Sequence, residues 1–291
     1  MKILEVKGVS YQYSPKTPFC KTALEDVNFS IEQGEWIGVI GHTGSGKSTL
    51  IQHLNGLLRP TSGTVLLHGK DIWENPKKIR SIRFQVGMVF QYPEYQLFEE
   101  TVEKDIAFGP RNQKLSDSEI HDRVQAAAKF VGLSQEMLKK SPFELSGGEK
   151  RRAAIAGVIA MDPEVLILDE PTAGLDPMGR DLILSQLMEY HRERKNTVLV
   201  VSHSMEDIAA TADRVLVLDQ GNVVMFGEPA EVFSRGPELA DMGLQVPQIT
   251  QIMAKLRDKG YPVPAGVLTL QQAVQALLPL MKRQEGGKAD G

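Results

Sequence analysis

This chain of 291 residues contains a single cysteine and only a small excess of acidic over basic residues. The single cysteine, Cys20, excludes an intrachain disulfide and a cysteine-rich zinc site, so we expect an inert thiol and a cytosolic chain. Basic residues number 33 and acidic residues 37, and the resulting net charge of −4 gives no general attraction for nucleic acid. We therefore expect no nucleic-acid partner.

Long apolar runs are also missing. Met1 to Val9 alternates apolar and polar residues like a strand, without the basic start, apolar stretch and cleavage site of a signal peptide. No window comes near the run of about 18 apolar residues that a membrane-spanning helix needs. A role at a membrane would therefore require a partner embedded in it.

What the chain does contain is the pattern of an α/β protein. Hydrophobic residues make up 42% and charged residues 24%, and the length corresponds to about two domains. Three short runs are apolar on both faces: Trp36 to Ile40, Val165 to Leu168 and Thr197 to Val201. Such runs are typical of central strands in a parallel sheet that helices cover.

Other segments predict strands outside this central group. Residues 1–35 and Thr64 to Asp71 favour an antiparallel sheet beside the first central strand. The runs Val215 to Leu218 and Val223 to Phe226 are joined by a turn-forming sequence and predict a hairpin.

Helical patterns fill much of the rest. We expect a helix over Lys47 to Leu58 and a helical region from Gln85 to Ala160, where Ser116 and Glu119 have the spacing of a capping box. Another mostly helical region follows residue 235, with Thr269 and Gln272 spaced to cap a helix, and the polar tail 284–291 is expected to be disordered.

A glycine-rich loop follows the first apolar strand and opens the first predicted helix. It fits the G-x-x-x-x-G-K-S/T pattern of a phosphate-binding loop and consists of Gly41, His42, Thr43, Gly44, Ser45, Gly46, Lys47, Ser48 and Thr49. The glycines let the backbone curl so that its N–H groups face phosphate oxygens, and the helix dipole favours the anion. Lys47 can reach the β- and γ-phosphates, and the Ser48 hydroxyl can bind Mg²⁺.

Two acidic residues end the second apolar run. Asp169 and Glu170 therefore lie at the C-terminal end of a buried strand, where open α/β sheets bind ligands. We expect Asp169 to hold Mg²⁺ through water and Glu170 to polarise an attacking water.

The stretch from Leu145 to Glu149 predicts a second anion-binding helix start. Ser146 and Glu149 have capping-box spacing, which explains the helix start but not the glycine pair between them. Gly147 and Gly148 lower helix propensity, yet they leave the N–H groups of the first turn open to a closely approaching anion. One γ-phosphate needs two such sites only when they come from different molecules.

These motifs and their order make the chain similar to the ATP-binding cassette (ABC) ATPases over roughly residues 1–235. The resemblance implies a P-loop α/β fold with a central, mostly parallel sheet, an antiparallel β subdomain and a helical subdomain at about residues 90–160. In that family two cassettes pair head to tail, with ATP between the phosphate loop of one and the signature motif of the other. Ser146, Gly147 and Gly148 would then contact the γ-phosphate in trans.

Four further residues match this family by position. Gln91 matches the glutamine that senses Mg²⁺ and water, and Asp176 matches a loop that crosses the dimer interface. His203 matches the switch histidine that contacts the γ-phosphate. Tyr13 best matches the aromatic residue that stacks on adenine, with Tyr11 as the alternative. No motif residue departs from the hydrolytic pattern, so the resemblance implies an active ATPase with ATP and Mg²⁺.

A finer resemblance is to the ATPases of energy-coupling factor (ECF) importers of vitamins and metals. It rests on Tyr92 to Phe98, Gly109-Pro110 and the run from Ile51 to Leu58. The insertion Ser14 to Phe19 is similar to that of the second of two paralogous ATPases in this group. Residues 236–291 fit its C-terminal dimerisation region.

This resemblance implies a peripheral subunit on the cytoplasmic face of the cell membrane that powers micronutrient uptake. A paralogous second ATPase is favoured over an identical copy, and the other implied partners are a transmembrane coupling protein and a membrane substrate-binding subunit. The alternatives are the ATPase of a cobalt or nickel importer and a soluble ABC ATPase acting on DNA or ribosomes. The sequence lacks the coiled coil of the DNA-repair type, the second cassette of the ribosomal type and the N-K-x-D motif of GTPases.

The aromatic stretch from Phe90 to Phe98 leaves two interpretations open. Its rings pack the core of the helical subdomain, or they line a groove for an amphipathic helix of a partner. In the second case the groove would move with Gln91 when ATP binds.

Overall fold

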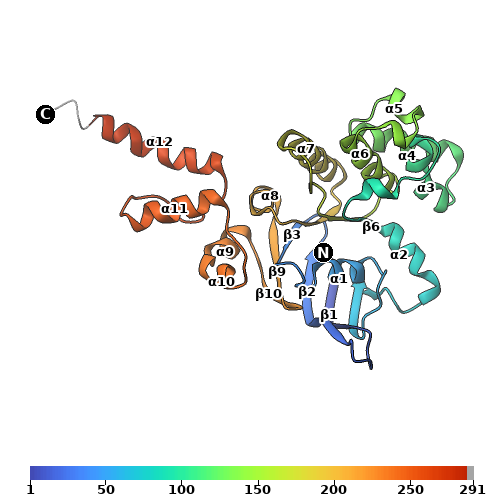
Figure 1. Cartoon of the computed structure of the whole chain (residues 1–291), viewed down its shortest axis with the longest axis horizontal. Helices are drawn as coiled ribbons and strands as arrows, with labels where there is room; N and C mark the ends of the chain where they lie inside the picture. Colours follow the sequence, from blue (N-terminus) through green and yellow to red (C-terminus); the bar gives the residue numbers. More distant parts are fainter. Residues whose placement is uncertain (287–291) are drawn as a thin grey trace.

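The computed structural model describes the backbone of residues 1–286 and the side chains of residues 1–280 (Figure 1). Its strands are β1 Lys2–Tyr13, β2 Lys21–Glu32, β3 Trp36–Ile40, β4 Ser62–Leu67, β5 Lys70–Asp71, β6 Val86–Val89, β7 Val165–Asp169, β8 Thr197–Val201, β9 Arg214–Asp219 and β10 Asn222–Gly227.

Helices connect and cover these strands. The α-helices are α1 Lys47–Leu54, α2 Ile79–Gln85, α3 Val102–Asn112, α4 Asp117–Phe130, α5 Gln135–Lys139, α6 Gly147–Ile159, α7 Pro177–Arg194, α8 Met205–Thr211, α9 Pro229–Ser234, α10 Gly236–Asp241, α11 Gln248–Asp258 and α12 Leu270–Gly286. Three short 3₁₀ helices are η1 Pro76–Lys78, η2 Pro93–Gln96 and η3 Pro142–Glu144. None of the described helices is both long enough and apolar enough to cross a bilayer.

The central sheet has six strands in the order β10-β9-β3-β8-β7-β6. All neighbouring pairs are parallel except the hairpin of β9 and β10. Every residue of β3, β7 and β8 is buried, because helices or the second sheet cover both faces. The predicted central strands and the predicted hairpin are confirmed.

The second sheet is antiparallel, in the order β2-β1-β4-β5, as the N-terminal pattern predicts. The helix α1 packs into the core shared by the two sheets. Its Leu50, Ile51 and Leu54 are buried in one cluster with Leu4 of β1 and Val39 of β3. This packing holds the start of α1 at the edge of the central sheet.

The other face of the central sheet is covered by helices. Ile40 of β3 and Leu168 of β7 belong to a second core cluster, with side chains from α3, α4, α6, α7 and α8. Helices α3 to α6 form a group at one end of the molecule (Figure 1). The capping box of Ser116 and Glu119 at the start of α4 is confirmed.

The C-terminal helices divide between two cores. Helices α9 and α10 contribute Val232, Phe233 and Leu239 to the core beneath the sheet, whereas α11 and α12 share a separate cluster around Met253 and Ala273. Figure 1 shows α11 and α12 projecting away from the sheets.

The predicted cap at the start of α12 is confirmed. Gln272 N donates to Thr269 Oγ1 over 3.3 Å, and Thr269 N donates to Gln272 Oε1 over 3.2 Å. Of the tail expected to be disordered, residues 284–286 complete α12, and residues 287–291 lie outside the described part.

Two predicted elements need correction. The region expected to be helical from Gln85 begins with the strand β6, because Val86–Val89 pairs in parallel with β7. A short apolar run fits a strand or a helix equally well, and only the neighbouring strand decides. The helix expected over Lys47 to Leu58 ends at Leu54, since Gly56 adopts a φ of +71°, and a Cβ there would lie 2.6 Å from Ile79 Cδ1.

A substitution of Gly63, near the start of β4, tests how closely β4 packs against β1 in the antiparallel sheet. Gly63 has a φ of +81°, and a Cβ there would lie 2.2 Å from the backbone oxygen of Gly8. Gly63→Ala should lower the free energy of unfolding by about 3 kcal/mol, combining backbone strain and overpacking. Gly69→Ala is the matched control, because its φ is +74° with open space around the Cβ, and it should cost about 1 kcal/mol. Denaturant titration measures both, and equal losses would contradict the close approach to Gly8.

Candidate functional site

The phosphate loop lies between β3 and α1 and closes around its own lysine. Gly44 and Gly46 have φ values of +85° and +107°, which lets the loop curl before α1 begins. Lys47 is buried, and its Nζ donates to Gly41 O over 2.6 Å and to His42 O over 3.0 Å. Burial lowers the pKa of Lys47, an effect opposed by the carboxylates of Glu170 and Asp169.

Asp169 is the last residue of β7, and Glu170 comes directly after this strand. Both side chains are buried, and Ser48 Oγ of the phosphate loop donates to Asp169 Oδ2 over 3.3 Å. Burial raises the pKa of Asp169, partly offset by the Ser48 hydroxyl and the charge of Lys47. Burial also raises the pKa of Glu170 to about 7, against the backbone N–H of His203, which favours the ionised form.

His203 follows β8 and faces Glu170. Its Nε2 lies 3.4 Å from Glu170 Oε1, and the imidazole is half exposed. Burial and the nearby charge of Lys47 lower the pKa of His203, so the neutral ring is favoured at neutral pH. Glu170 itself has a φ of +52°, a backbone conformation that few residues adopt outside constrained sites.

One cavity of about 370 Å³ collects most of the predicted site residues. It is lined by Tyr13, Lys21, Ala23, Thr43, Gly44, Gly46, Lys47, Ser48, Thr49, Gln91, Asp169, Glu170, Val201 and His203. Of the remaining phosphate-loop residues, Gly41 and Ser45 are buried behind the loop, and His42 faces an adjoining cavity.

Three lining residues were not predicted from the sequence. Lys21 lies opposite Tyr13 in the β1–β2 register, and Ala23 follows it along β2. Val201 is the last residue of β8. The exposed loop Ser14 to Phe19 separates Tyr13 from Lys21, so only the hairpin pairing reveals that they are neighbours.

The geometry favours Tyr13 over Tyr11 as the residue that would meet the base of a nucleotide. The Tyr13 hydroxyl lies 3.1 Å from Thr49 Oγ1, and its ring is 41% exposed at the cavity. Tyr11 packs edge to face on His53 with ring centroids 4.7 Å apart and borders the core. Adenine stacking on Tyr13 stays a prediction.

The Ser146 motif lies outside this cavity. Ser146 and Glu149 form the predicted capping box, with Ser146 N donating to Glu149 Oε2 over 2.8 Å. Added Cβ atoms on Gly147 and Gly148 would meet nothing within 4 Å. The packing of this chain therefore does not require glycine at either position, and contact of this motif with a second molecule stays a prediction.

Asp176 is also outside the cavity and is exposed. Its Oδ1 accepts a hydrogen bond from Gly179 N over 2.7 Å and caps α7. The capping bond explains an aspartate at this position without a second chain, so a role at an interface stays a prediction.

A second cavity, of about 430 Å³, lies between α2, β6, α3 and α6. Its apolar lining includes Phe84, Met88, Phe90, Leu97, Phe98, Phe108, Val158 and Met161. Phe90 is partly buried against the core shared by the two sheets, whereas Phe98 and Phe108 form an edge-to-face pair and are both exposed. The aromatic stretch therefore both packs the core and lines a groove.

Arg151 of α6 connects η2, at the edge of this groove, to the loop that follows Glu170. Its Nε and Nη2 donate to the Glu94 carboxylate over 3.1 and 2.7 Å, and its Nη1 donates to Pro171 O over 3.4 Å. Arg151 is only 3% exposed, so this bidentate pair is shielded from solvent. Glu94 lies in η2, whose last residue, Gln96, lines the groove, and Pro171 follows Glu170 directly.

Comparison with known proteins agrees with this geometry. A family model described as ABC transporter matches residues 24–173. The energy-coupling factor transporter ATP-binding proteins EcfA2 of Clostridium tetani and Clostridium perfringens are 53% identical over 282 residues and 54% identical over 280 residues. These alignments cover 97% and 96% of this chain and 98% of each relative.

Solved structures show the same fold. The structure of cbiO1 from Clostridium perfringens, described as part of the ABC transporter complex cbiONQ, has a TM-score of 0.74 at 41% identity and covers 87% of this chain and 99% of that one. The ATP-binding cassette MJ0796, a dimer bound to ADP and Pi, has a TM-score of 0.70 at 28% identity and covers 78% and 99%. The chain thus belongs to the ABC transporter family and, within it, to the energy-coupling factor transporter ATP-binding proteins, which are ATPases.

Proposed function

We propose that this chain is the ATP-hydrolysing subunit of an ECF-type importer and powers the uptake of vitamins or other micronutrients. The observation that carries the proposal is the single cavity in which Lys47, Asp169, Glu170 and His203 face one another. Near-complete alignment with ECF ATP-binding proteins supports the transport role. The second candidate is the ATPase of a cobalt or nickel importer.

The donor atoms in the cavity fit Mg²⁺ bound together with ATP. Ser48 Oγ and Asp169 Oδ2 lie 3.3 Å apart, and Gln91 lines the same cavity, so hydroxyl, carboxylate and amide oxygens are available. Glu170 Oε1 is buried and accepts no hydrogen bond within the described residues, which leaves it available for a water. Mg²⁺, when bound, would neutralise charge on the β- and γ-phosphates.

The protein residues then divide the work. Lys47 exchanges its bonds to the Gly41 and His42 carbonyls for phosphate oxygens, and Tyr13 stacks on the base. Glu170 orients the attacking water and accepts its proton, a role suited to a carboxyl with a pKa of about 7. His203 lies beside Glu170 and contacts the γ-phosphate.

A second ATPase completes each site. Ser146, Gly147 and Gly148 lie outside the cavity, and the space around the two glycines is open. Head-to-tail pairing places this motif against the phosphate loop of a partner, and Asp176 at the boundary. We favour a paralogous ATPase over an identical copy as that partner.

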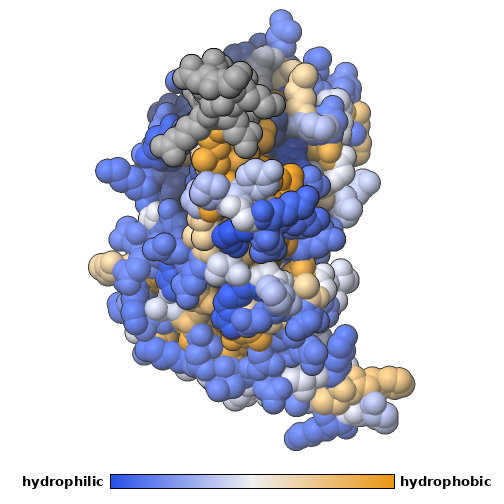
Figure 2. Space-filling model, turned by 90° about the vertical axis from the view of Figure 1, so that its left-hand side faces the viewer, coloured by the Kyte–Doolittle hydropathy of each residue, from blue (hydrophilic) through white to orange (hydrophobic). Residues whose placement is uncertain are grey.

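The C-terminal helices provide a further surface for pairing. Ile252 of α11 and Leu270, Val274 and Leu278 of α12 are exposed although they are apolar. Figure 2 looks onto this end of the molecule and shows hydrophobic surface there. Contact between the C-terminal regions of two ATPases would remove this surface from water.

The groove beside α3 and α6 is the site proposed for the membrane coupling protein. Its apolar lining and exposed rings suit a cytoplasmic amphipathic helix, and Tyr95 next to it is 85% exposed. Arg151 joins this groove to the residues after Glu170. The subunit would therefore bind the cytoplasmic face of the cell membrane through its partners, which include a substrate-binding subunit.

Glu170→Gln tests the catalytic role of the carboxyl. The amide cannot accept a proton from water, so ATP turnover should fall by about a hundredfold or more while ATP binding persists. Phosphate release and nucleotide titration measure the two effects. Glu164→Gln changes an exposed carboxyl next to the opposite end of β7 and should leave turnover unchanged. Undiminished turnover by Glu170→Gln would refute the assignment.

The pH dependence of turnover tests the raised pKa of Glu170. Because the carboxyl works as a base when ionised, kcat/KM for ATP should increase from about pH 5.5 to pH 8, with its midpoint near the pKa of about 7. The residual activity of Glu170→Gln should lack this rise. A profile that is flat above about pH 5.5 would mean an ordinary carboxyl.

Phe108→Glu tests the coupling groove. A charge beside Phe98 should abolish co-purification with the membrane coupling protein, because a carboxylate is costly to bury against an apolar helix. Nucleotide binding should remain. Phe19→Glu is the control, since this phenylalanine is 83% exposed on the β1–β2 loop and does not line the groove. Equal loss of the complex in both variants would argue against a groove-specific contact.

A further inference from the structure

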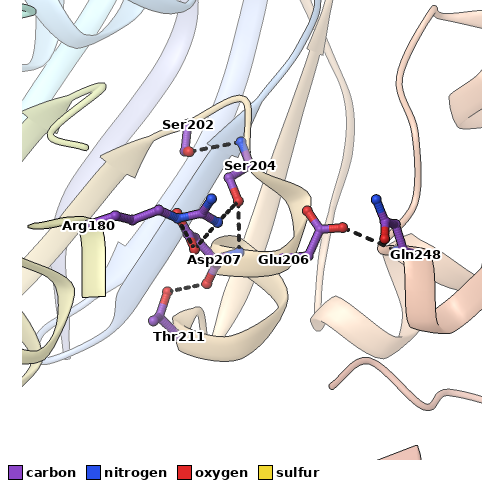
Figure 3. Close-up of polar contacts among 7 residues, drawn as sticks. All are labelled: Arg180, Ser202, Ser204, Glu206, Asp207, Thr211 and Gln248. Carbon is purple, nitrogen blue, oxygen red and sulfur yellow. Dashed lines mark hydrogen bonds and ion pairs between the residues drawn. The ribbon is translucent and has the colours of Figure 1, made fainter. Parts of the chain in front are cut away.

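Arg180, near the start of α7, binds the loop that carries the switch histidine (Figure 3). Its Nε donates to Asp207 Oδ1 of α8 over 3.0 Å, and its Nη2 donates to both Asp207 and Ser204 Oγ. Ser204 is the residue after His203. One guanidinium therefore binds both Ser204, which caps α8, and Asp207, which lies in the first turn of this helix.

The contacts of Ser204 determine the path of the backbone at His203. Ser204 Oγ accepts from Asp207 N over 3.1 Å and caps α8, while Ser204 N donates to Ser202 Oγ over 3.0 Å. The imidazole of His203 is half exposed, and its Nε2 lies 3.4 Å from Glu170 Oε1. The position of the ring thus depends on the backbone of residues 202–204 more than on packing around the ring.

Charge makes the Arg180 contact hard to replace. Asp207 is buried, and its Oδ2 has no hydrogen-bond partner within the described residues. Without the guanidinium this carboxylate would be left uncompensated. A lysine could supply the charge but not the planar fork that reaches Asp207 and Ser204 together.

The same helix begins at the loop expected to cross the dimer interface. Asp176 caps α7 through Gly179, the residue just before Arg180. Because Gly179 and Arg180 are neighbours in the first turn of α7, we expect a displacement of this cap to move the Arg180 side chain as well. The loop at Asp176 and the loop at His203 are therefore joined within one chain.

We propose that Arg180 is a positioning residue that sets the place of His203 and links it to the Asp176 loop. The inference rests on the proposed role of His203 in turnover. Arg180 does not line the ATP cavity, so its effect on the reaction would pass through the Ser204 and Asp207 contacts.

A double-variant cycle in the assembled ATPase tests this link. Arg180→Ala should lower kcat on the order of tenfold, with KM for ATP unchanged, because it misplaces a group used in turnover. In a His203→Ala background, Arg180→Ala should change kcat by no more than about twofold. The same loss in both backgrounds would overturn the inference and indicate a merely structural role.

Two further variants support the test. Arg192→Ala removes an exposed arginine from the far end of α7 and should leave kcat unchanged. If Arg180→Ala fails to fold, Arg180→Lys retains the charge and should give an intermediate kcat, and wild-type kcat in that variant would overturn the inference. Undiminished turnover by His203→Ala would refute the proposed role of His203 and this inference with it, whereas an additive cycle would refute only the inference.

Discussion

Parallel pairing of four strands is the constraint on which the proposed ATP site depends. β3, β8, β7 and β6 are neighbours and run in one direction, so their C-terminal ends meet along a single edge. The phosphate loop follows β3, His203 follows β8, Glu170 follows β7 and Gln91 follows β6. Residues from distant parts of the chain thereby face one cavity.

Burial shifts the pKa values of the charged residues in that cavity. Lys47, Asp169 and Glu170 are all nearly covered, so each loses favourable contact with water in its charged form. The lysine pKa falls and the carboxyl pKa values rise, although opposite charges in the cavity partly offset both effects. Binding of a polyanion together with a cation would stabilise the charged forms of these residues. The polyanion would interact with the lysine, and the cation would interact with the carboxylates.

Arginines extend the site to distant surfaces. Arg151 joins the groove at Glu94 to the backbone after Glu170, and Arg180 joins the start of α7 to the loop at His203. Both guanidinium groups bind several partners in fixed directions, which a point charge cannot do. Each arginine therefore connects a surface feature to the residue next to a proposed site residue, Glu170 or His203.

The sequence alone predicted the fold class, the central strands and the P-loop. These features depend on local apolar runs and on a glycine pattern that is typical of phosphate-binding loops. The sequence did not reveal β6, because a four-residue apolar run becomes a strand only when β7 lies beside it. Nor did it reveal Lys21, which reaches the cavity through hairpin pairing across an exposed loop. Local pattern determined which residues could bind phosphate; tertiary structure decided their burial and partners, because both depend on segments far apart in the chain.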